Sequence, residues 1–451
     1  MPASTIRNAG IGHARAAMEQ PMLNSSCNTV AVLGVPFHNL TMEEVVALLE
    51  GHIREGSFHQ VATANVDFLR NAMHDERLRA TLCSCDVVIP DGMPVVWLSK
   101  LLGTPLKERV TGVDLVERLA DVSARRGYGI FLLGASETHS QRAARVLRQR
   151  FPELRIVGRY SPEPQPLETM NHEEILRRIE EASPDILLVA FGNPKQEQWL
   201  AMHRDRLKVP VCIGVGGTLD FLSGTMPRAP RWMQTTGLEW LYRAVREPRR
   251  LTARYLSDAL CLLRHLPGYL AASASQPRRS ASSAIVVHQV GNTKLISPIG
   301  DLTGPALAEF NTFSLDAYKE GMNIVLDLTQ TGHMSPESLG SLIYLESRMR
   351  RRREQLWLAG MPAHLSRILR AGQLHNYFMT TTMVSDALYR TAKAEQRLLA
   401  SFTPPWGTFR QETSPVGVRM ELLQNVCRRI VAAKQSEESA LTPAAFASAG
   451  R

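Results

Sequence analysis

The sequence contains no run of about 18 apolar residues, and its first residues lack the apolar core of a secretion signal. We therefore expect a soluble or peripheral protein that stays in the cytoplasm. Six cysteines are scattered along the chain, and Cys83 and Cys85 have no second cysteine or histidine pair at zinc-binding spacing. This scarcity excludes a disulfide-rich secreted domain, and we expect reduced thiols.

Two short motifs are absent as well. No Asp-x-Asp pair occurs in the chain, although many enzymes use such a pair to hold a divalent metal on a diphosphate. Near the first apolar strand, at Val30–Gly34, neither a complete Gly-x-Gly-x-x-Gly fingerprint nor its partner acidic residue is evident. These absences predict a site without a metal and argue against an oxidoreductase that uses a dinucleotide.

Positive charge, in contrast, is in excess. The 451 residues carry a formal net charge of +9, and arginine supplies most of the excess. Such a charge favours an anionic partner, which could be nucleotide phosphates, an anionic membrane surface or a nucleic acid. Because no RNA- or DNA-binding motif accompanies it, we do not expect a nucleic-acid partner.

The length predicts two domains with tails, and 44% hydrophobic residues suffice for two cores. Composition and periodicity divide the chain into a disordered tail (1–27), a first domain (28–236), a basic amphipathic appendage (237–270), a linker (271–283), a second domain (284–393) and a mostly disordered tail (394–451) that contains one potential helix (420–433).

Within the first domain, apolar strands alternate with helices of about ten to fifteen residues. We expect strands at 30–34, 59–66, 86–90, 129–134, 154–158, 185–191 and 209–214, and helices at 41–55, 68–83, 112–126, 136–151, 171–182 and 196–206. This alternation predicts an α/β fold with a Rossmann-like, mostly parallel sheet and helices on both faces. Ligands of such sheets bind beyond the carboxyl ends of the strands.

Polar side chains follow two of these strands. Asp91 comes directly after a buried strand and precedes Gly92, so it could act as a general base, or it could cap a helix that begins near Met93. Thr63 and Asn65 end another strand, where they could bind a sugar or diphosphate, or form an N-cap or Asx turn. For the neighbouring Asp67 we expect the N-cap of the following helix.

A second polar string, Gly192–Glu197, lies between a buried strand and a helix. Lys195 could neutralise phosphate, and Gln196 could bind a uracil edge or a sugar hydroxyl through its amide. An ordinary strand–helix turn with a solvated Lys/Glu pair is the alternative.

Glycines and arginines complete the candidate site. Gly214–Gly217 and Gly134 follow strands, where backbone could approach a phosphate, although glycines there are as easily structural. Since no Asp-x-Asp pair is present, arginines would have to neutralise a diphosphate, and planar guanidinium groups suit that task. The candidates are Arg228, Arg231, Arg243, Arg249 and Arg250.

These motifs, over residues 28–268, resemble the WecG/TagA/CpsF glycosyltransferases, also called glycosyltransferase family 26. The resemblance implies an inverting transferase that moves a sugar from a UDP-sugar to a polyprenyl-diphosphate-linked saccharide at the inner face of the bacterial cytoplasmic membrane, without a cofactor. It implies that Asp91 is the base, with Thr63 and Gln196 as further catalytic residues. The expected substrate-binding residues are Asn65, Gly92, Gly134, Asn193, Lys195, Glu197, Gly216, Gly217, Asp220, Arg228, Arg243, Arg249 and Arg250.

The second domain resembles a STAS domain, the fold of anti-sigma-factor antagonists. We expect strands at 284–290, 294–299, 323–328 and 355–358, and helices at 305–318, 338–352 and 363–371. Pro336 stands where this family carries its phosphorylated serine, and Ser338 is the expected helix cap. We therefore expect a docking or oligomerising module, with a protein partner or a second copy of the chain. The alternative for the whole chain is a catalytically silent signalling scaffold.

Overall fold

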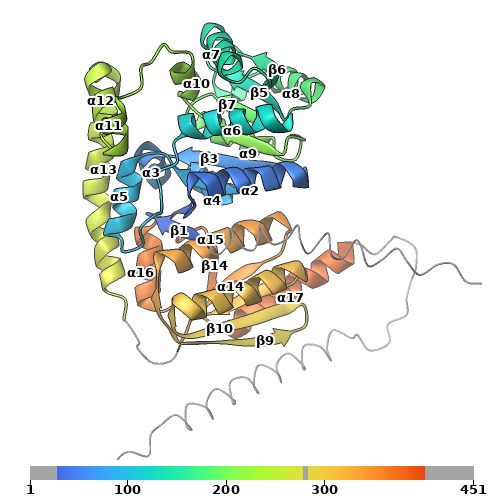
Figure 1. The fold of residues 1–451 in the computed structure, drawn as a ribbon. Helices are drawn as coiled ribbons and strands as arrows, with labels where there is room; N and C mark the ends of the chain where they lie inside the picture. The colour runs from blue at the N-terminus through green and yellow to red at the C-terminus, as the bar shows by residue number, and fades with distance from the viewer. Residues whose placement is uncertain (1–27, 278–282, 402–451) are drawn as a thin grey trace, which may run out of the picture.

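A six-stranded parallel sheet organises the first domain of the computed structural model, which describes residues 28–277 and 283–401 (Figure 1). The strand order is β4-β3-β8-β7-β5-β6. The strands are β3 (His59–Ala64), β4 (Val87–Pro90), β5 (Gly129–Gly134), β6 (Arg155–Tyr160), β7 (Ile186–Ala190) and β8 (Val211–Gly214). All but β6 are buried nearly throughout because helices cover both faces, and this confirms the predicted fold class.

The covering helices follow the expected pattern closely. They are α2 (Met42–Glu55), α3 (Val66–His74), α4 (Glu76–Ser84), α5 (Met93–Leu101), α6 (Gly112–Arg126), α7 (Glu137–Arg150), α8 (His172–Ala182), α9 (Lys195–Met202) and α10 (Thr218–Leu222), with a short 3₁₀ turn at Leu167–Thr169. Thr41 caps α2 as expected, in a reciprocal capping box with Glu44.

Two expectations for the first domain are wrong in detail. The helix predicted at 68–83 is interrupted at Asp75, whose carboxylate accepts hydrogen bonds from the backbone of the following turn and thereby caps α4. The first strand is a hairpin of β1 (Thr29–Val32) and β2 (Val35–His38), which turns at Leu33 and Gly34, both with positive φ.

The second domain is a smaller α/β unit, as predicted. Its sheet has the order β12-β10-β11-β13-β14, and β9 pairs with β10 as the antiparallel strand. The strands are β9 (Ala284–Val290), β10 (Thr293–Leu302), β11 (Asn323–Asp327), β12 (Thr331–Met334), β13 (Leu356–Ala359) and β14 (Met379–Thr381). The helices are α14 (Gly304–Lys319), α15 (Pro336–Arg351), α16 (Ala363–Ala371) and α17 (Val384–Ser401).

Helices α11 (Arg231–Thr235), α12 (Glu239–Arg246) and α13 (Pro248–Ala274) form the predicted appendage. Helix α13 runs down one side of the molecule and packs on α3 of the first domain and α16 of the second (Figure 1). It continues into the predicted linker, and α17 continues beyond the predicted end of the second domain. The predicted tail at 1–27 and the potential helix at 420–433 lie outside the described residues.

The N-terminal hairpin joins the two domains, because both of its strands pack on α15. The side chain of Ala31 is part of the apolar core of the second domain. A Cβ atom at Gly340 of α15 would lie 2.7 Å from the Thr29 carbonyl oxygen, so only glycine allows this approach. The two domains therefore share a continuous apolar interface.

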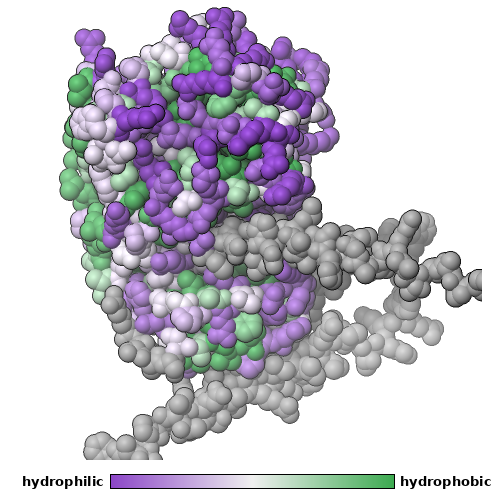
Figure 2. All heavy atoms as spheres, viewed as in Figure 1, coloured by the Kyte–Doolittle hydropathy of each residue, from purple (hydrophilic) through white to green (hydrophobic). Residues whose placement is uncertain are grey.

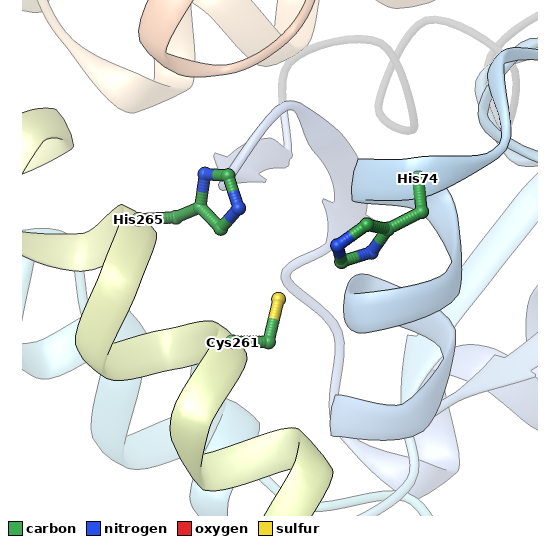
Figure 3. Close-up of side chains that lie close together, drawn as sticks. All are labelled: His74, Cys261 and His265. Atoms are coloured by element: carbon green, nitrogen blue, oxygen red, sulfur yellow. The ribbon is translucent and has the colours of Figure 1, made fainter.

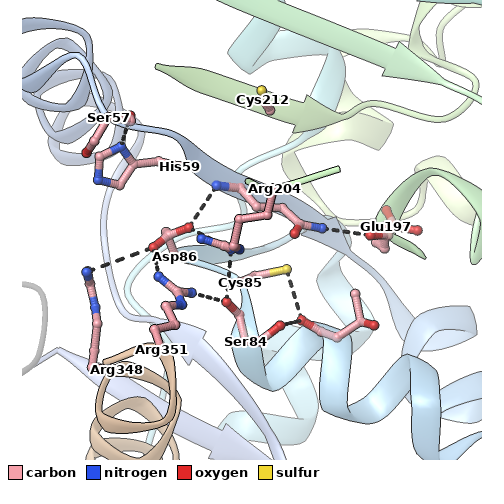
Figure 4. A network of polar contacts seen from close by, with 12 residues as sticks. Ser57, His59, Ser84, Cys85, Asp86, Glu197, Arg204, Cys212, Arg348 and Arg351 are labelled. Atoms are coloured by element: carbon pink, nitrogen blue, oxygen red, sulfur yellow. Dashed lines mark hydrogen bonds and ion pairs between the residues drawn. The ribbon is translucent and has the colours of Figure 1, made fainter. Parts of the chain in front are cut away.

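A buried ion-pair network reinforces this interface (Figure 4). Asp86, which precedes β4, is 2% exposed and pairs with Arg351 of α15. Arg204 lies 3.1 Å from the other carboxylate oxygen, and Arg348 lies 4.0 Å from the first. Burial alone would raise the pKa of Asp86, but the three guanidinium charges outweigh it and hold the pKa well below its usual range.

Across residues 28–277 and 283–401, no helix combines the length and the apolar character needed to cross a membrane.

Candidate active site

The carboxyl ends of the parallel strands bring the predicted polar residues to one edge of the first sheet. Thr63 is the penultimate residue of β3, and its hydroxyl donates a hydrogen bond of 2.9 Å to the Gly214 carbonyl at the end of β8. The Asp91 backbone N–H, directly after β4, donates to the Ala64 carbonyl at 2.9 Å. Polar residues from strands far apart in the chain thus meet at this edge.

Asp91 is partly buried at this edge, and the backbone N–H of Gly112 donates a hydrogen bond to its carboxylate. Burial raises the pKa of Asp91 to about 6, with a smaller contribution from Glu239, while the charges of Arg243 and Arg109 oppose the rise. The capping alternative is not realised, because Gly92 is the N-cap of α5 and no side chain caps that helix. The carboxylate therefore has the pKa of a base that works near neutral pH.

Three arginines surround the site, and the appendage supplies one of them. Arg109 lies 3.0 Å from Glu239, which also lies 3.6 Å from Arg228. Arg228 forms a further ion pair with Asp114 on α6. The Arg243 guanidinium of α12 lies 4.9 Å from the centre of the Phe221 ring.

Two of these guanidinium groups have unused hydrogen-bonding capacity. Within the described residues, the buried Nε atoms of Arg228 and Arg243 have no hydrogen-bond partner. An anionic group entering the site could accept from them. Arg249, predicted to join them, is exposed near the start of α13, and the Arg250 side chain lies outside the described part of the structure.

Gln196 and Glu197 lie behind this edge of the sheet, and each is 1% exposed. The Gln196 amide oxygen accepts from the backbone N–H groups of Gly192 and Gly216, and its NH₂ group donates to Glu197 at 2.7 Å. Burial raises the pKa of Glu197 to about 8, although the hydrogen bond from Gln196 opposes the rise. The pair ties together the loops that follow β7 and β8.

Asn193 and Lys195 of the same string lie farther forward. The Asn193 amide donates to Asp67 at 3.2 Å, and its buried oxygen has no hydrogen-bond partner among the described residues. The Lys195 ammonium donates to the Gln165 carbonyl and lies 5.3 Å from the Phe191 ring centre. Of these two side chains, Asn193 is the one with a buried polar atom that lacks a hydrogen-bond partner among the described residues.

Asn65 is the N-cap of α3, where its side-chain oxygen accepts from the Asp67 backbone at 3.0 Å. The prediction that Asp67 caps this helix is therefore wrong. Asp67 lies within the first turn instead, and its carboxylate pairs with Arg70. Of the two roles considered for Asn65, substrate binding and helix capping, its side chain performs helix capping in this structure.

The predicted glycines differ in role. A Cβ atom at Gly134 would lie 2.7 Å from the Ala190 carbonyl oxygen, so this glycine allows two strands to approach. Gly216, with φ of +50°, has open space where a Cβ would be. Gly217 precedes α10, on which Asp220 accepts a 2.6 Å hydrogen bond from His139.

The sequence analysis did not single out Arg109, Asp114 or His139 of this region. It also did not predict that Glu239 forms ion pairs here. The local signal for Arg109 was Arg109-Val-Thr-Gly112, a polar string between two helices that resembles the other strand-end motifs in composition. No local pattern signalled the pairings themselves.

A parallel α/β sheet with a carboxylate at a strand end and arginines around it suits an enzyme that acts on an anionic substrate. The sequence profile of the glycosyl transferase WecG/TagA/CpsF family matches residues 30–276, and the chain belongs to this family. The protein is therefore a glycosyltransferase. The match ends before the second domain.

The names of two similar proteins agree with this assignment. A protein of Bacillus spizizenii (strain ATCC 23059 / NRRL B-14472 / W23) is 32% identical over 240 residues, which cover 53% of this chain and 86% of the relative. A protein of Staphylococcus aureus (strain MRSA252) is 29% identical over 229 residues, or 50% of this chain and 88% of the relative. Both are named N-acetylglucosaminyldiphosphoundecaprenol N-acetyl-beta-D-mannosaminyltransferase.

Proposed function

We propose that this protein transfers a sugar, with inversion, from a UDP-sugar to a polyprenyl-diphosphate-linked saccharide in the synthesis of a bacterial surface or exopolysaccharide. The observation that carries the proposal is the position of Asp91, at a strand end, with a raised pKa and with Arg109 and Arg243 beside it. The names of the relatives support a polyprenyl-diphosphate acceptor and make UDP-N-acetylmannosamine the first donor to test.

In the proposed reaction, the Asp91 carboxylate takes the proton of the acceptor hydroxyl as that oxygen attacks the anomeric carbon of the donor. The bond from this carbon to the diphosphate oxygen breaks on the opposite face, and UDP leaves with the electron pair. Positive charge develops on the sugar and negative charge on the leaving diphosphate. We assign neutralisation of the diphosphate, in place of a divalent metal, to Arg243 and Arg228. Among the described residues, the Arg243 Nε atom has no hydrogen-bond partner, and the Arg228 Nε atom lies 3.6 Å from Glu239.

For Gln196 and Thr63 we propose positioning roles in place of direct catalysis. Both side chains are buried and bonded to backbone groups of the strand-end loops. Gln196 fixes the distance between the loops after β7 and β8, and Thr63 fixes β3 against β8. The substrate-binding surface then consists of Asn193, Gly216 and the arginines in front of them.

The appendage offers a surface for an anionic membrane. Hydrophobic side chains follow the edge of the molecule that α12 and α13 form (Figure 2). The exposed apolar residues on α11, α12 and α13 are Trp232, Trp240, Leu241, Val245, Leu256, Leu260 and Leu263. Exposed arginines such as Arg246 and Arg249 alternate with them. This combination suits a helix lying in the interface of anionic lipid, where a polyprenyl-linked acceptor would be presented.

The second domain acts, in this proposal, as a docking module without a phosphoswitch. Ser335 is the N-cap of α15, which corrects the expectation that Ser338 caps this helix. Ser338 is fully buried and donates to the Leu302 carbonyl. Neither hydroxyl is presented to a kinase. A cavity of about 860 Å³ between the domains, lined in part by Thr104, Gln276 and Glu337, is a place for a regulatory ligand or peptide.

The test is acceptor-dependent release of UDP by the purified full-length chain. A panel of UDP-sugars would be offered with a polyprenyl-diphosphate-N-acetylglucosamine analogue, alongside Asp91→Asn and the exposed control Asp205→Asn. We expect release from one donor, retained in the control and lost in Asp91→Asn. Donor binding by the wild type without turnover on any acceptor of this class would contradict the proposal and favour a silent scaffold.

A further inference from the structure

The interface between α3 and α13 gathers three side chains that the proposed reaction does not use. His74 ends α3, and Cys261 and His265 lie on α13, where all three point into the space between the helices (Figure 3). One nitrogen or sulfur atom of each lies within 4.8 Å of the others. Cys261 is buried, His265 is partly buried and His74 is exposed, so the cluster opens to solvent on one side.

The two helices present matching faces to each other. Positions i, i+3 and i+7 of a helix share one face, and the facing residues are Asp67, Arg70 and His74 on α3 and Asp258, Cys261 and His265 on α13. The middle of this face is already joined, because Arg70 lies 3.2 Å from Asp258. The cluster lies one helical turn from that ion pair, which fixes the position of α13 against α3.

The three donor atoms are of the kind that zinc prefers. Imidazole nitrogen and thiolate sulfur bind Zn²⁺ at about 2.0–2.3 Å in tetrahedral sites, where neighbouring ligand atoms lie about 3.5 Å apart. Cys261 and His265 are separated by one helical turn and so project from the same face. Small side-chain rotations would close the remaining separation, and the exposed His74 is free to make them.

The surroundings of His74 favour a ligand role. Its Nδ1 atom lies 2.8 Å from the Arg70 carbonyl oxygen. As the donor of that hydrogen bond, Nδ1 carries the proton and leaves the Nε2 lone pair available, which is the arrangement that orients most histidine ligands of metals. The positive charge of Arg70 is compensated by Asp67 and Asp258. Arg264 is a further positive charge near His265.

We propose that His74, Cys261 and His265 bind a zinc ion, with water in the fourth position on the exposed side. The ion would fasten α13 to α3. Helix α13 directly follows α12, which carries Arg243 and Glu239 at the candidate active site, so the ion would steady the segment that closes that site. The site is separate from the sugar-transfer chemistry, and it stands or falls independently of the proposed function.

Metal content of the full-length chain tests the proposal. After incubation with Zn²⁺ and desalting, elemental analysis should find one zinc per chain in the wild type and in His288→Gln, which alters an exposed histidine on β9. His74→Gln, at an exposed position that tolerates polar substitution, should lose the metal. Zinc-free wild type, or equal zinc in His74→Gln, would overturn the site.

Cobalt substitution and thermal unfolding supply readouts that do not depend on activity. With Co²⁺ in place of zinc, the wild type should show thiolate-to-cobalt charge-transfer absorption, which Cys261→Ser should lack. Zinc should raise the unfolding temperature of the wild type and leave that of His74→Gln unchanged. A charge-transfer band that persists in Cys261→Ser, or equal stabilisation of His74→Gln by zinc, would refute the assignment.

Discussion

Strand β4 is flanked by two aspartates, Asp86 before its first residue and Asp91 after its last, and both lie among arginines. Around Asp86, three guanidinium groups serve one buried carboxylate and hold its pKa well below the usual range. Around Asp91, Glu239 shares the arginines, and burial raises the pKa to about 6. One strand thus has at one end a carboxylate with a lowered pKa that joins the two domains, and at the other end a carboxylate with a raised pKa.

The comparison shows what decides the role of a buried carboxylate. Asp86 has cations on several sides, so its charge is compensated and its proton affinity is low. Asp91 forms no direct ion pair with any residue that the structure describes, so its charge is only partly compensated and its proton affinity is high. The same residue type therefore serves to hold two domains together in one place and is suited to proton transfer in the other.

The largest effect is expected from Asp91→Asn. If this carboxylate is the base, its loss should lower turnover by about 10²–10⁴-fold. Stability should not fall, because the change removes a partly uncompensated charge from a buried position. Steady-state kinetics, donor titration and thermal unfolding would be measured together, with Asp205→Asn as the exposed control. Turnover within the range of the control would remove Asp91 from the mechanism.

Asp86→Asn should show the opposite pattern. Removing the anion leaves Arg351, Arg204 and Arg348 near one another without their shared partner. Breaking a buried pair in this way costs about 3–5 kcal/mol. Chemical denaturation should show this loss, and the folded fraction should keep most of its turnover. A change in stability no larger than that of Asp205→Asn would mean that the network does not hold the domains together.

Sequence patterns predicted the features that depend on residues close together in the chain better than those that depend on residues far apart. Helix α6 and strand β5 have the expected bounds because local signals define them: Thr111 caps α6, and Gly127 ends it in the left-handed conformation. The position of Asp91 at a strand end was likewise a local inference, and the structure agrees with it.

What the sequence could not supply is the pairing of remote charges. Arg351 is 265 residues from Asp86, and Arg109 is 130 residues from Glu239. Arg351 belongs to a basic helix end and Arg109 to a loop between two helices, and nothing near either residue in sequence specifies its partner. The burial of Gln196 was not evident from the sequence for a related reason, because it depends on loops from β7 and β8 that only the tertiary fold brings together.

A pH series sharpens the contrast between the aspartates. Asp86 has a folded pKa below its ordinary value of 3.8, so its contribution to stability is present above that pH and is lost on further acidification. Asp91 has a folded pKa of about 6, so its charge disfavours the fold above that pH, and protonation relieves the cost.

Activity should therefore fall on acidification before the fold does. Protonation of Asp91 should lower kcat/KM with an apparent pKa of about 6, while circular dichroism stays unchanged down to about pH 4. Asp86→Asn should shift the unfolding transition without moving the acid limb of the activity profile. An activity loss that coincides with unfolding in the wild type would contradict the assignment of the raised pKa to a catalytic group.

The smallest effect on turnover is expected from omitting Mg²⁺ and Mn²⁺. This experiment tests whether arginines neutralise an anion at the Asp91 end of β4, as they do at the Asp86 end. At the Asp86 end they neutralise a carboxylate of the protein itself. At the Asp91 end, we assign the diphosphate to Arg228 and to Arg243, whose Nε atom has no hydrogen-bond partner among the described residues, so turnover should not change when these ions are left out. Zinc would be kept at saturation throughout, so that the cluster between α3 and α13 is unaffected. If turnover instead required Mg²⁺ or Mn²⁺, the arginines at the Asp91 end would be insufficient for the leaving group. Arginines alone would then neutralise an anion only at the Asp86 end of the strand.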